Sequence, residues 1–481
     1  MPELMVTAAR TKGQVQVKAK SPAKKPVKLA IPTKRPARTF ESAMKFLFSH
    51  TDYEQMLRVR YNRDTFSLDR MRKLLKQLGD PHLKLKTVHI AGTKGKGSTC
   101  TILASMLQAC GYRTGLYTSP HICDVRERIT INGDMISQAA LTRLICRAEP
   151  IIAKMADLRP TFFEIFTALA FTHFVEQGVQ LAVIETGLGG RLDSTNVLEP
   201  NVCGITNISY DHMAQLGSTL AEIAAEKAGI MKPSTPVICV PQEAEAKRVL
   251  RRHAKEVKAN LMFISEDIEF SYRVESSRNA GCRTRVCLTT PLSKFEHLPM
   301  PLLGEHQAVN CGLALALLDQ LRGQGFDRIT DAKAIAGLLN VKVPGRMEMV
   351  NQDPRVMVDG AHNAASIQAL MRAIGQHIPY DSMVMVFGCA SDKDIRGMMD
   401  QIATGADKVI FTKAAANPRA CDPRELAEIY EERSGRVAQV CETLPQAMRV
   451  AHSAVSREDL ICVTGSFYLV GEAKLLFQGR K

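Results

Sequence analysis

A glycine-rich stretch at residues 91–99 carries the clearest chemical pattern in this sequence. It reads Ala-Gly-Thr-Lys-Gly-Lys-Gly-Ser-Thr, follows an apolar run at residues 87–90 and precedes a helical pattern. A glycine-rich turn between a strand and a helix presents backbone N–H groups and the helix dipole to phosphate. Lys96 would reach the outer phosphates of a nucleotide, and Ser98 or Thr99 would bind magnesium. The alternative is a strand-to-helix turn that binds no ligand.

Polar residues also follow the next three predicted strands. Ser119, Glu185 and the pair Asp211-His212 stand at the ends of these apolar runs. Open α/β sheets bind ligands at the carboxyl ends of their strands. Hard oxygen ligands with few protein charges suit magnesium. A lone histidine is more often structural than a ligand, and His212 is a candidate because it follows a strand beside an aspartate.

Two further groups have both a functional and a structural interpretation. Lys227 stands in the last turn of a helical pattern that ends at Gly229. The residues alone favour a lysine that complements the helix dipole. Asp359 and His362 follow a strand and open a helix, and Arg346 lies shortly before them. Arginine suits bidentate phosphate contact, whereas the alternatives are an N-cap aspartate and a surface arginine.

Two alternating strand–helix segments must position these residues. Short apolar runs separated by helical patterns of ten or more residues predict mostly parallel sheets with helices on both faces. Residues 266–300 alternate apolar and polar positions, which predicts small antiparallel strands. We expect a domain boundary at the proline-containing stretch 298–302. The predicted strands are residues 88–91, 114–118, 181–186, 202–207 and 236–240, then 356–359, 383–387, 408–411 and 460–464.

Composition limits the remaining possibilities. The net charge of +14 is concentrated in residues 1–38, which hold ten lysines or arginines and a single acid, Glu3. Such a segment cannot bury enough apolar surface to order itself, so we expect a disordered basic tail. It could contact nucleic acid, although a solvated extension is the simpler interpretation. The thirteen cysteines include no C-x-x-C pair, which favours reduced thiols in the cytoplasm. No apolar run reaches transmembrane length.

Ten ordered motifs, read together, give a family resemblance. They are HIAGTKGKGST, TSPHICDVRERITING, TFFEIFTALAF, ETGLGGRLDSTN, ITNISYDHMAQLG, EIAAEKAGIMKP, GEHQAVNCGLALA, PGRME, VDGAHN and TGSFYLVGE. From residue 41 to 481 the chain resembles the folylpolyglutamate synthase and dihydrofolate synthase family, a branch of the Mur-ligase-like ATP-dependent amide ligases. The resemblance implies a P-loop, Mur-ligase-like central ATPase domain at residues 39–299 and a C-terminal Rossmann-like α/β glutamate ligase domain at residues 300–481.

The resemblance also implies roles for individual residues. It implies catalytic roles for Lys96, Lys227, Arg346 and His362, with Lys227 carbamylated. The residues implied in ATP binding are Gly92, Thr93, Lys94, Gly95, Lys96, Gly97, Ser98, Asn310, Arg346 and Asp359. Those implied in pterin and folate binding are Thr161, Phe162, Phe163, Glu164, Leu192, Asp193 and Ser194. The implied metal ligands are Ser98, Ser119, Glu185 and His212.

The implied reaction is ATP-dependent transfer of L-glutamate onto tetrahydrofolate, and onto dihydropteroate, through an acyl phosphate. Its cofactors would be ATP and two magnesium ions, and a monovalent cation stays open. We expect a cytoplasmic monomer with small-molecule substrates and without a membrane partner. The loop departs from the usual family pattern by having Lys94 where asparagine is common. Two alternatives remain: a Mur-like ligase for another carboxylate, and a non-catalytic nucleotide-binding or nucleic-acid-associated protein.

Overall fold

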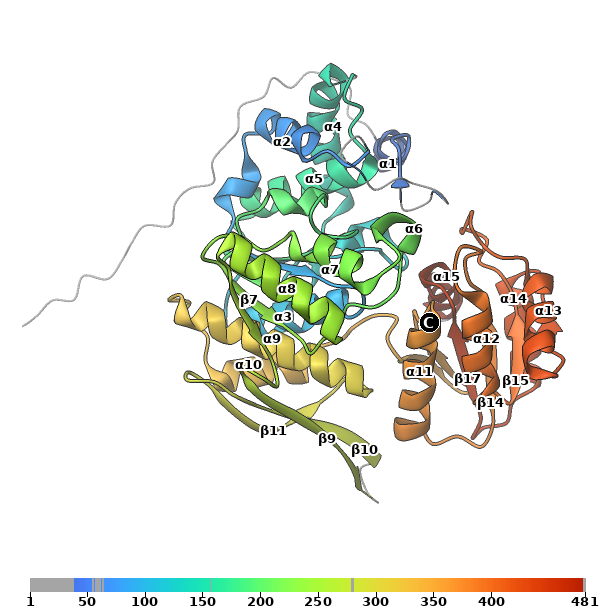
Figure 1. Cartoon of the computed structure of the whole chain (residues 1–481). Coiled ribbons are helices and arrows are strands. Elements are labelled where there is room, and N and C mark those ends of the chain that lie inside the picture. The colour runs from blue at the N-terminus through green and yellow to red at the C-terminus, as the bar shows by residue number, and fades with distance from the viewer. Residues whose placement is uncertain are drawn as a thin grey trace, which may run out of the picture.

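The structure is a computed structural model that describes residues 39–478, apart from 54–55, 57–61, 63–64, 156 and 278–280. The basic tail predicted at residues 1–38 lies outside the described residues. The described residues form two α/β bodies, seen side by side in Figure 1.

The first body is built on an eight-stranded sheet with the order β4-β3-β2-β5-β1-β6-β7-β8. The strands from β2 to β8 in this order pair in parallel, whereas β3 and β4 add antiparallel pairs at one edge. The central strands β1 and β5 are buried along their whole length, because helices cover both faces of the sheet. The strands are β1 Thr87–Ala91, β2 Thr114–Tyr117, β3 Ile129–Ile131, β4 Asp134–Met135, β5 Leu181–Glu185, β6 Val202–Ile205, β7 Pro236–Cys239 and β8 Asn260–Phe263.

Alternate residues of these strands face two apolar layers. Val88, Ile90 and Val202 pack into the layer under α3, α9 and α10. Ala182 and Ile184 face the layer formed by α1, α2, α4 and α5, and α7 and α8 cover the rest of that face. The helices are α1 Phe40–Phe48, α2 Leu68–Gln77, α3 Lys96–Ala109, α4 Gln138–Lys154, α5 Phe162–Glu176, α6 Met213–Leu216, α7 Leu220–Ala228, α8 Ala244–Val257, α9 Glu305–Gly323 and α10 Asp331–Leu339.

The structure differs from the predicted domain boundary at residues 299 and 300. The proline-containing stretch there is not a linker, because it ends β11 (Lys294–Met300), which pairs with β10 (Gly281–Thr289) beside β9 (Glu269–Ser277). Helix α9, predicted in the second domain, is buried around most of its circumference between α3 and this small sheet. The chain passes to the second body only after α10, at residues 342–345.

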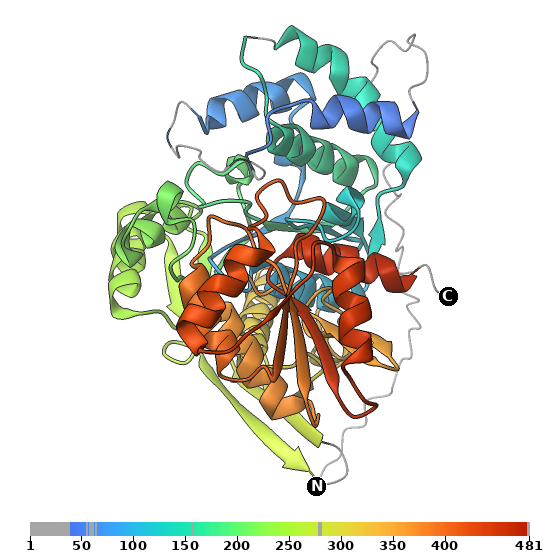
Figure 2. The same ribbon diagram turned by 90° about the vertical axis from the view of Figure 1, so that its right-hand side faces the viewer.

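The second body holds a six-stranded sheet with the order β12-β13-β17-β14-β15-β16. Only the β12–β13 pair is antiparallel among its described pairs. Figure 2, where this domain faces the viewer, shows helices on both sides of the sheet. The elements are β12 Glu348–Gln352, β13 Arg355–Val358, α11 Ala364–His377, β14 Met383–Phe387, α12 Ile395–Ala403, β15 Lys408–Phe411, α13 Pro423–Ser434, β16 Gln439–Val440, α14 Leu444–Ser453, β17 Leu460–Thr464 and α15 Phe467–Gln478.

The sequence predicted this architecture well. The two mostly parallel sheets are confirmed, and each of the nine predicted strands lies within two residues of an observed one. The antiparallel strands expected at residues 266–300 are β9, β10 and β11. Among the described helices, none combines the length and the apolar character needed to cross a membrane.

Candidate active site

A cavity of about 680 Å³ lies between the two domains. Loops that follow β1, β2, β5 and β6 line it on one side, and loops that follow β14, β15 and β17 line it on the other. Its volume is in the range of small-molecule sites. Most of the predicted site residues line it: Gly92, Thr93, Lys94, Gly95, Lys96, Gly97, Ser98, Ser119, Thr161, Phe163, Glu164, Glu185, Leu192, Asp193, Ser194, His212, Lys227, Arg346 and His362.

The structure contradicts the predicted substrate contact of Phe162. This side chain is 1% exposed, and its ring stacks on those of Phe48 and Phe166 at 5.6 Å each. Neighbouring residues of a helix point about 100° apart, so the two adjacent phenylalanines face different surroundings, and one of them lines the cavity. That residue is Phe163, whose ring lies against Gly187, where an added Cβ would come within 2.5 Å of it.

Asn310 and Asp359, predicted as ATP contacts, lie behind the cavity wall. The Asn310 side chain packs under the glycine-rich loop, since a Cβ on Gly95 would stand 2.2 Å from its Oδ1. Asp359 accepts hydrogen bonds from the backbone N–H groups of Met347, at 2.9 Å, and Ala361, at 2.8 Å. In this conformation both side chains position the loops that do reach the cavity.

The glycine-rich loop has the geometry of an anion site. Gly92 has φ +150° and a Cβ there would meet Thr206 Oγ1 at 1.8 Å, so no other residue fits. Gly95, at φ +89°, precedes the first turn of α3 and has no side chain to cap it. The N–H groups of that turn are therefore available to an anion. Lys96 Nζ folds back over the loop and donates to the Gly92 carbonyl at 3.2 Å and the Thr93 carbonyl at 3.4 Å.

Glu185 is the strongest candidate for a metal ligand. The carboxylate is 4% exposed and accepts a hydrogen bond from Ser119 N at 3.1 Å. Burial raises its pKa to about 7, although the nearby Lys96 opposes the shift. A buried carboxylate that is short of partners fits a hard divalent cation. Among the described residues, no three acids, histidines or cysteines cluster as a metal site, so such an ion would also depend on hydroxyls, water and substrate oxygens.

His212 sits beside this region in an unusual backbone conformation. Its φ is +51°, and it precedes the short helix α6. Asp211 Oδ1 lies 3.9 Å from its Nε2. The surrounding cavity walls partly desolvate the ring and lower the His212 pKa although 45% of the side chain is exposed, and Asp211 opposes this shift. An uncharged ring can donate a nitrogen lone pair to a cation.

Lys227 is buried at the end of α7, where it is 3% exposed. Its Nζ donates to the Gly92 carbonyl at 2.8 Å, so the side chain points under the glycine-rich loop and not into solvent. Burial, and next the positive charge of Lys96, lower its pKa to about 7. Lys227 does stand in the last turn of α7, as the sequence predicted, and its buried amine also contacts the glycine-rich loop.

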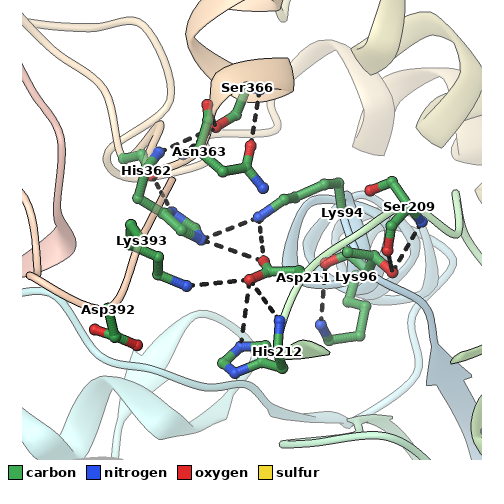
Figure 3. A network of polar contacts seen from close by, with 12 residues as sticks. Lys94, Lys96, Ser209, Asp211, His212, His362, Asn363, Ser366, Asp392 and Lys393 are labelled. Carbon is green, nitrogen blue, oxygen red and sulfur yellow. Dashed lines mark hydrogen bonds and ion pairs between the residues drawn. The ribbon is translucent and has the colours of Figure 1, made fainter. Parts of the chain in front are cut away.

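A network of charged groups crosses between the domains (Figure 3). Asp211, from the first domain, accepts hydrogen bonds from Lys94 at 2.7 Å and from Lys393, of the second domain, at 3.1 Å. Lys94 Nζ also lies 3.0 Å from His362 Nε2. Because His362 Nδ1 is 2.7 Å from the Gly360 carbonyl, it carries the proton and Nε2 accepts from Lys94.

The charges of this network are mutually dependent. Burial opposes ionisation of Asp211, but the ammonium groups of Lys94 and Lys393 outweigh it and hold the Asp211 pKa far below its usual range. Burial lowers the Lys94 pKa to about 8 despite Asp211. Burial and Lys94 together lower the His362 pKa to about 4, so that ring is neutral near pH 7. Lys94 thus joins the domains.

Replacing Lys94 by methionine should loosen the contact between the domains. The variant loses the hydrogen bond to His362, on the order of 1 kcal/mol for a partly exposed charged donor, while Asp211 keeps Lys393. We expect a larger radius of gyration of the ligand-free protein in small-angle X-ray scattering, and a further increase in the double variant with Lys393→Met.

Lys84→Met is the matched control, because Lys84 Nζ lies on the exposed surface and donates to the nearby Gly79 carbonyl, far from the network. If Lys94→Met and Lys84→Met scatter alike and the double variant is also unchanged, the network does not hold the domains together.

Sequence reasoning missed three charged residues and one polar residue of the cavity. Lys393, Asn417 and Arg419 come from the loops after β14 and β15, and Arg70 comes from α2. Arg419 donates to Asp392 at 3.1 and 3.2 Å. The first three follow predicted strands of the second sheet, and this position could have identified them as candidates for the site. Arg70 follows no strand, so nothing in the local pattern indicated it.

Comparison with known proteins agrees with this geometry. Residues 90–318 match the Mur ligase middle domain, and residues 345–467 match the Mur ligase, glutamate ligase domain. A Bacillus subtilis relative, named dihydrofolate synthase/folylpolyglutamate synthase, is 34% identical over 85% of this chain and 94% of its own length. A solved Mycobacterium tuberculosis folylpolyglutamate synthase, complexed with ADP and AMPPCP, has a TM-score of 0.79 and 33% identity and covers 86% of this chain and 95% of its own.

A Haloferax volcanii relative, named "Probable bifunctional folylpolyglutamate synthase/dihydropteroate synthase", is 36% identical over 84% of this chain, which spans 47% of that protein.

The two domain matches and the interdomain cavity place the protein among the Mur ligases, a class of ATP-dependent amide ligases. Within that class, the chain belongs to the folylpolyglutamate synthase/dihydrofolate synthase family.

Proposed function

We propose that this protein adds L-glutamate to folates, and to dihydropteroate, at the cost of ATP. The observation that carries the proposal is one cavity that joins a phosphate-binding loop, a buried carboxylate and cations from a second domain. The acceptor carboxylate attacks the γ-phosphate of ATP to give an acyl phosphate and ADP. The glutamate amine then attacks the acyl carbon, and phosphate leaves as the amide forms.

The chain's own groups divide this work. Lys96 and the N–H groups of the first turn of α3 hold the phosphates and stabilise the charge of the transferring group. Arg346, from the second domain, adds a cation on the opposite wall; its guanidinium stacks 4.8 Å from the Phe467 ring centre. Because both domains line the cavity, a closed arrangement keeps water from the acyl phosphate.

The L-glutamate subsite is proposed on the second-domain wall. This substrate brings two carboxylates, and Lys393 and Arg419 supply two cations there. In the structure Lys393 pairs with Asp211 and Arg419 pairs with Asp392, at 3.1 Å in each case. The incoming carboxylates would replace these protein carboxylates as partners of the two cations.

Magnesium would be held by Glu185, with Ser98, Ser119 and His212 as further ligands. The ion would supply Lewis-acid stabilisation of phosphate charge.

Lys227 is proposed to be carbamylated, because its amine is buried and a pKa of about 7 leaves much of it uncharged, as reaction with CO₂ requires. We further propose that the protein acts as a cytoplasmic monomer with a domain boundary near residue 343.

The test is ADP release by the purified protein with MgATP and L-glutamate, comparing dihydropteroate, tetrahydrofolate and no acceptor, with products identified by mass spectrometry. Turnover with both acceptors supports the full proposal, and turnover with tetrahydrofolate alone restricts it to polyglutamylation. If no folate acceptor causes ADP release, in protein that still binds ATP, the proposal is contradicted and a Mur-like ligase for another carboxylate is favoured.

A further inference from the structure

One end of the cavity is formed by a group of side chains that we name the acceptor wall: Tyr53, Phe66, Arg70, Phe163 and Glu164. Three of them come from the segment before β1, which packs on α5 through a hydrogen bond from Phe162 N to the Thr51 carbonyl at 2.9 Å. The Tyr53 and Phe66 ring centres are 5.0 Å apart. The wall is therefore mainly aromatic, with a single ion pair.

That ion pair is built into the fold. Arg70 Nε donates to both carboxylate oxygens of Glu164, at 2.8 and 2.7 Å. Glu164 also accepts from Thr161 N at 2.8 Å, as part of the capping box that begins α5. The side chains of Arg70 and Glu164 are 11% and 3% exposed. All of these contacts hold Glu164 in place and fix its orientation toward Arg70.

Arg70 has hydrogen-bonding capacity left over. Its Nε is used by Glu164, and its Nη2 donates to the Thr65 carbonyl at 2.9 Å. Among the residues that the structure describes, Nη1 has no hydrogen-bond partner. A guanidinium carries two N–H groups on that nitrogen. Since Arg70 lines the cavity, Nη1 is the part of the wall that can donate to a bound molecule.

The charge balance of the wall selects the kind of group that it can bind. The Glu164 carboxylate offsets the charge of Arg70, so a second carboxylate would gain little there. A neutral, flat ring that carries an acceptor atom fits better, because it can stack on the aromatic side chains and accept from Nη1. The acceptor's own carboxylate belongs at the other end of the cavity, near Lys96.

We propose that Arg70 recognises the flat head group of the acceptor by donating from Nη1 to a ring oxygen or nitrogen, and so determines acceptor specificity. This inference rests on the proposed function and adds a residue to it. Arg70 touches the substrate far from the reacting carboxylate, so its contribution is to binding and orientation. Glu164 acts as the positioning residue that fixes the plane of the guanidinium.

The decisive variant is Arg70→Lys, which keeps a cation for Glu164 but removes Nη1, together with Nη2 and its hydrogen bond to the Thr65 carbonyl. Steady-state kinetics with varied dihydropteroate, ATP or L-glutamate measure each KM separately, and thermal unfolding reports stability. We expect the KM for dihydropteroate to rise at least tenfold, with the KM values for ATP and L-glutamate within twofold and Tm close to that of the wild type. Arg72→Lys is the matched control, since Arg72 lies on the same helix and pairs with Asp69 at the surface.

Other outcomes overturn the inference. An unchanged dihydropteroate KM in Arg70→Lys shows that Nη1 does not bind the acceptor. A lower Tm with equal changes in all three KM values shows that Arg70 is merely structural, and Arg70→Met should then behave in the same way. If the wild-type protein has no ligase activity on any folate acceptor, the proposed function is wrong, and this inference, which rests on it, is wrong as well.

Discussion

Replacing Lys96 by alanine should lower kcat about a thousandfold, in the range seen when a preorganised charge-stabilising donor is removed. The ammonium is the cation that the glycine-rich loop itself directs toward a transferring phosphate. Among the residues that the structure describes, the Lys96 ammonium donates only to the Gly92 and Thr93 carbonyls, and Lys227 also donates to Gly92. Removing this side chain should cost the fold little stability, so Tm should stay near that of the wild type.

The measurement is single-turnover ADP formation, with thermal unfolding as the check on folding. Binding of a non-hydrolysable ATP analogue by calorimetry separates lost affinity from lost chemistry. Lys333→Ala, an exposed lysine on α10, is the control and should retain full activity. Near-normal kcat in Lys96→Ala, with a normal Tm, would remove the phosphate role assigned to this loop.

Replacing Lys227 by alanine should be nearly as severe, with a loss of about a hundredfold or more. Its buried amine lies under the phosphate loop and is the group proposed to become a carbamate, which turns a cation into an anionic oxygen donor. Alanine leaves a space that a small carboxylate can enter, so millimolar acetate or formate should restore part of the activity. Methionine fills the same space, and Lys227→Met should be inactive and insensitive to these anions.

The wild-type enzyme should show a matching dependence on pH and CO₂. Burial lowers the Lys227 pKa to about 7. The amine is therefore charged and unreactive below that pH, and neutral above it. Protein depleted of CO₂ should regain activity on adding bicarbonate, faster at pH 8 than at pH 6. Full activity in Lys227→Ala without added carboxylate, or no response to CO₂ depletion, would leave Lys227 without a catalytic role.

The fold was predictable because its information is local. Continuous apolar runs such as residues 181–184, and helical patterns beside them, predict buried parallel strands whichever domain they join. The domain boundary could not be predicted from local sequence patterns. Helix α9 is apolar around most of its surface, and such a pattern says that a helix is buried but not against which sheet.

Within the site, the sequence by itself determined the glycine-rich loop, the polar residues at the strand ends and hence the family, since these depend on residue type and spacing along the chain. The tertiary structure decided the rest. Side-chain direction made Phe163, and not Phe162, the cavity residue. Burial made Lys227 a weakly basic amine. Lys94, Asp211 and Lys393 meet across two domains. Contacts between residues far apart in sequence and the desolvation that accompanies them exist only once the chain has packed, so no local pattern could have encoded them.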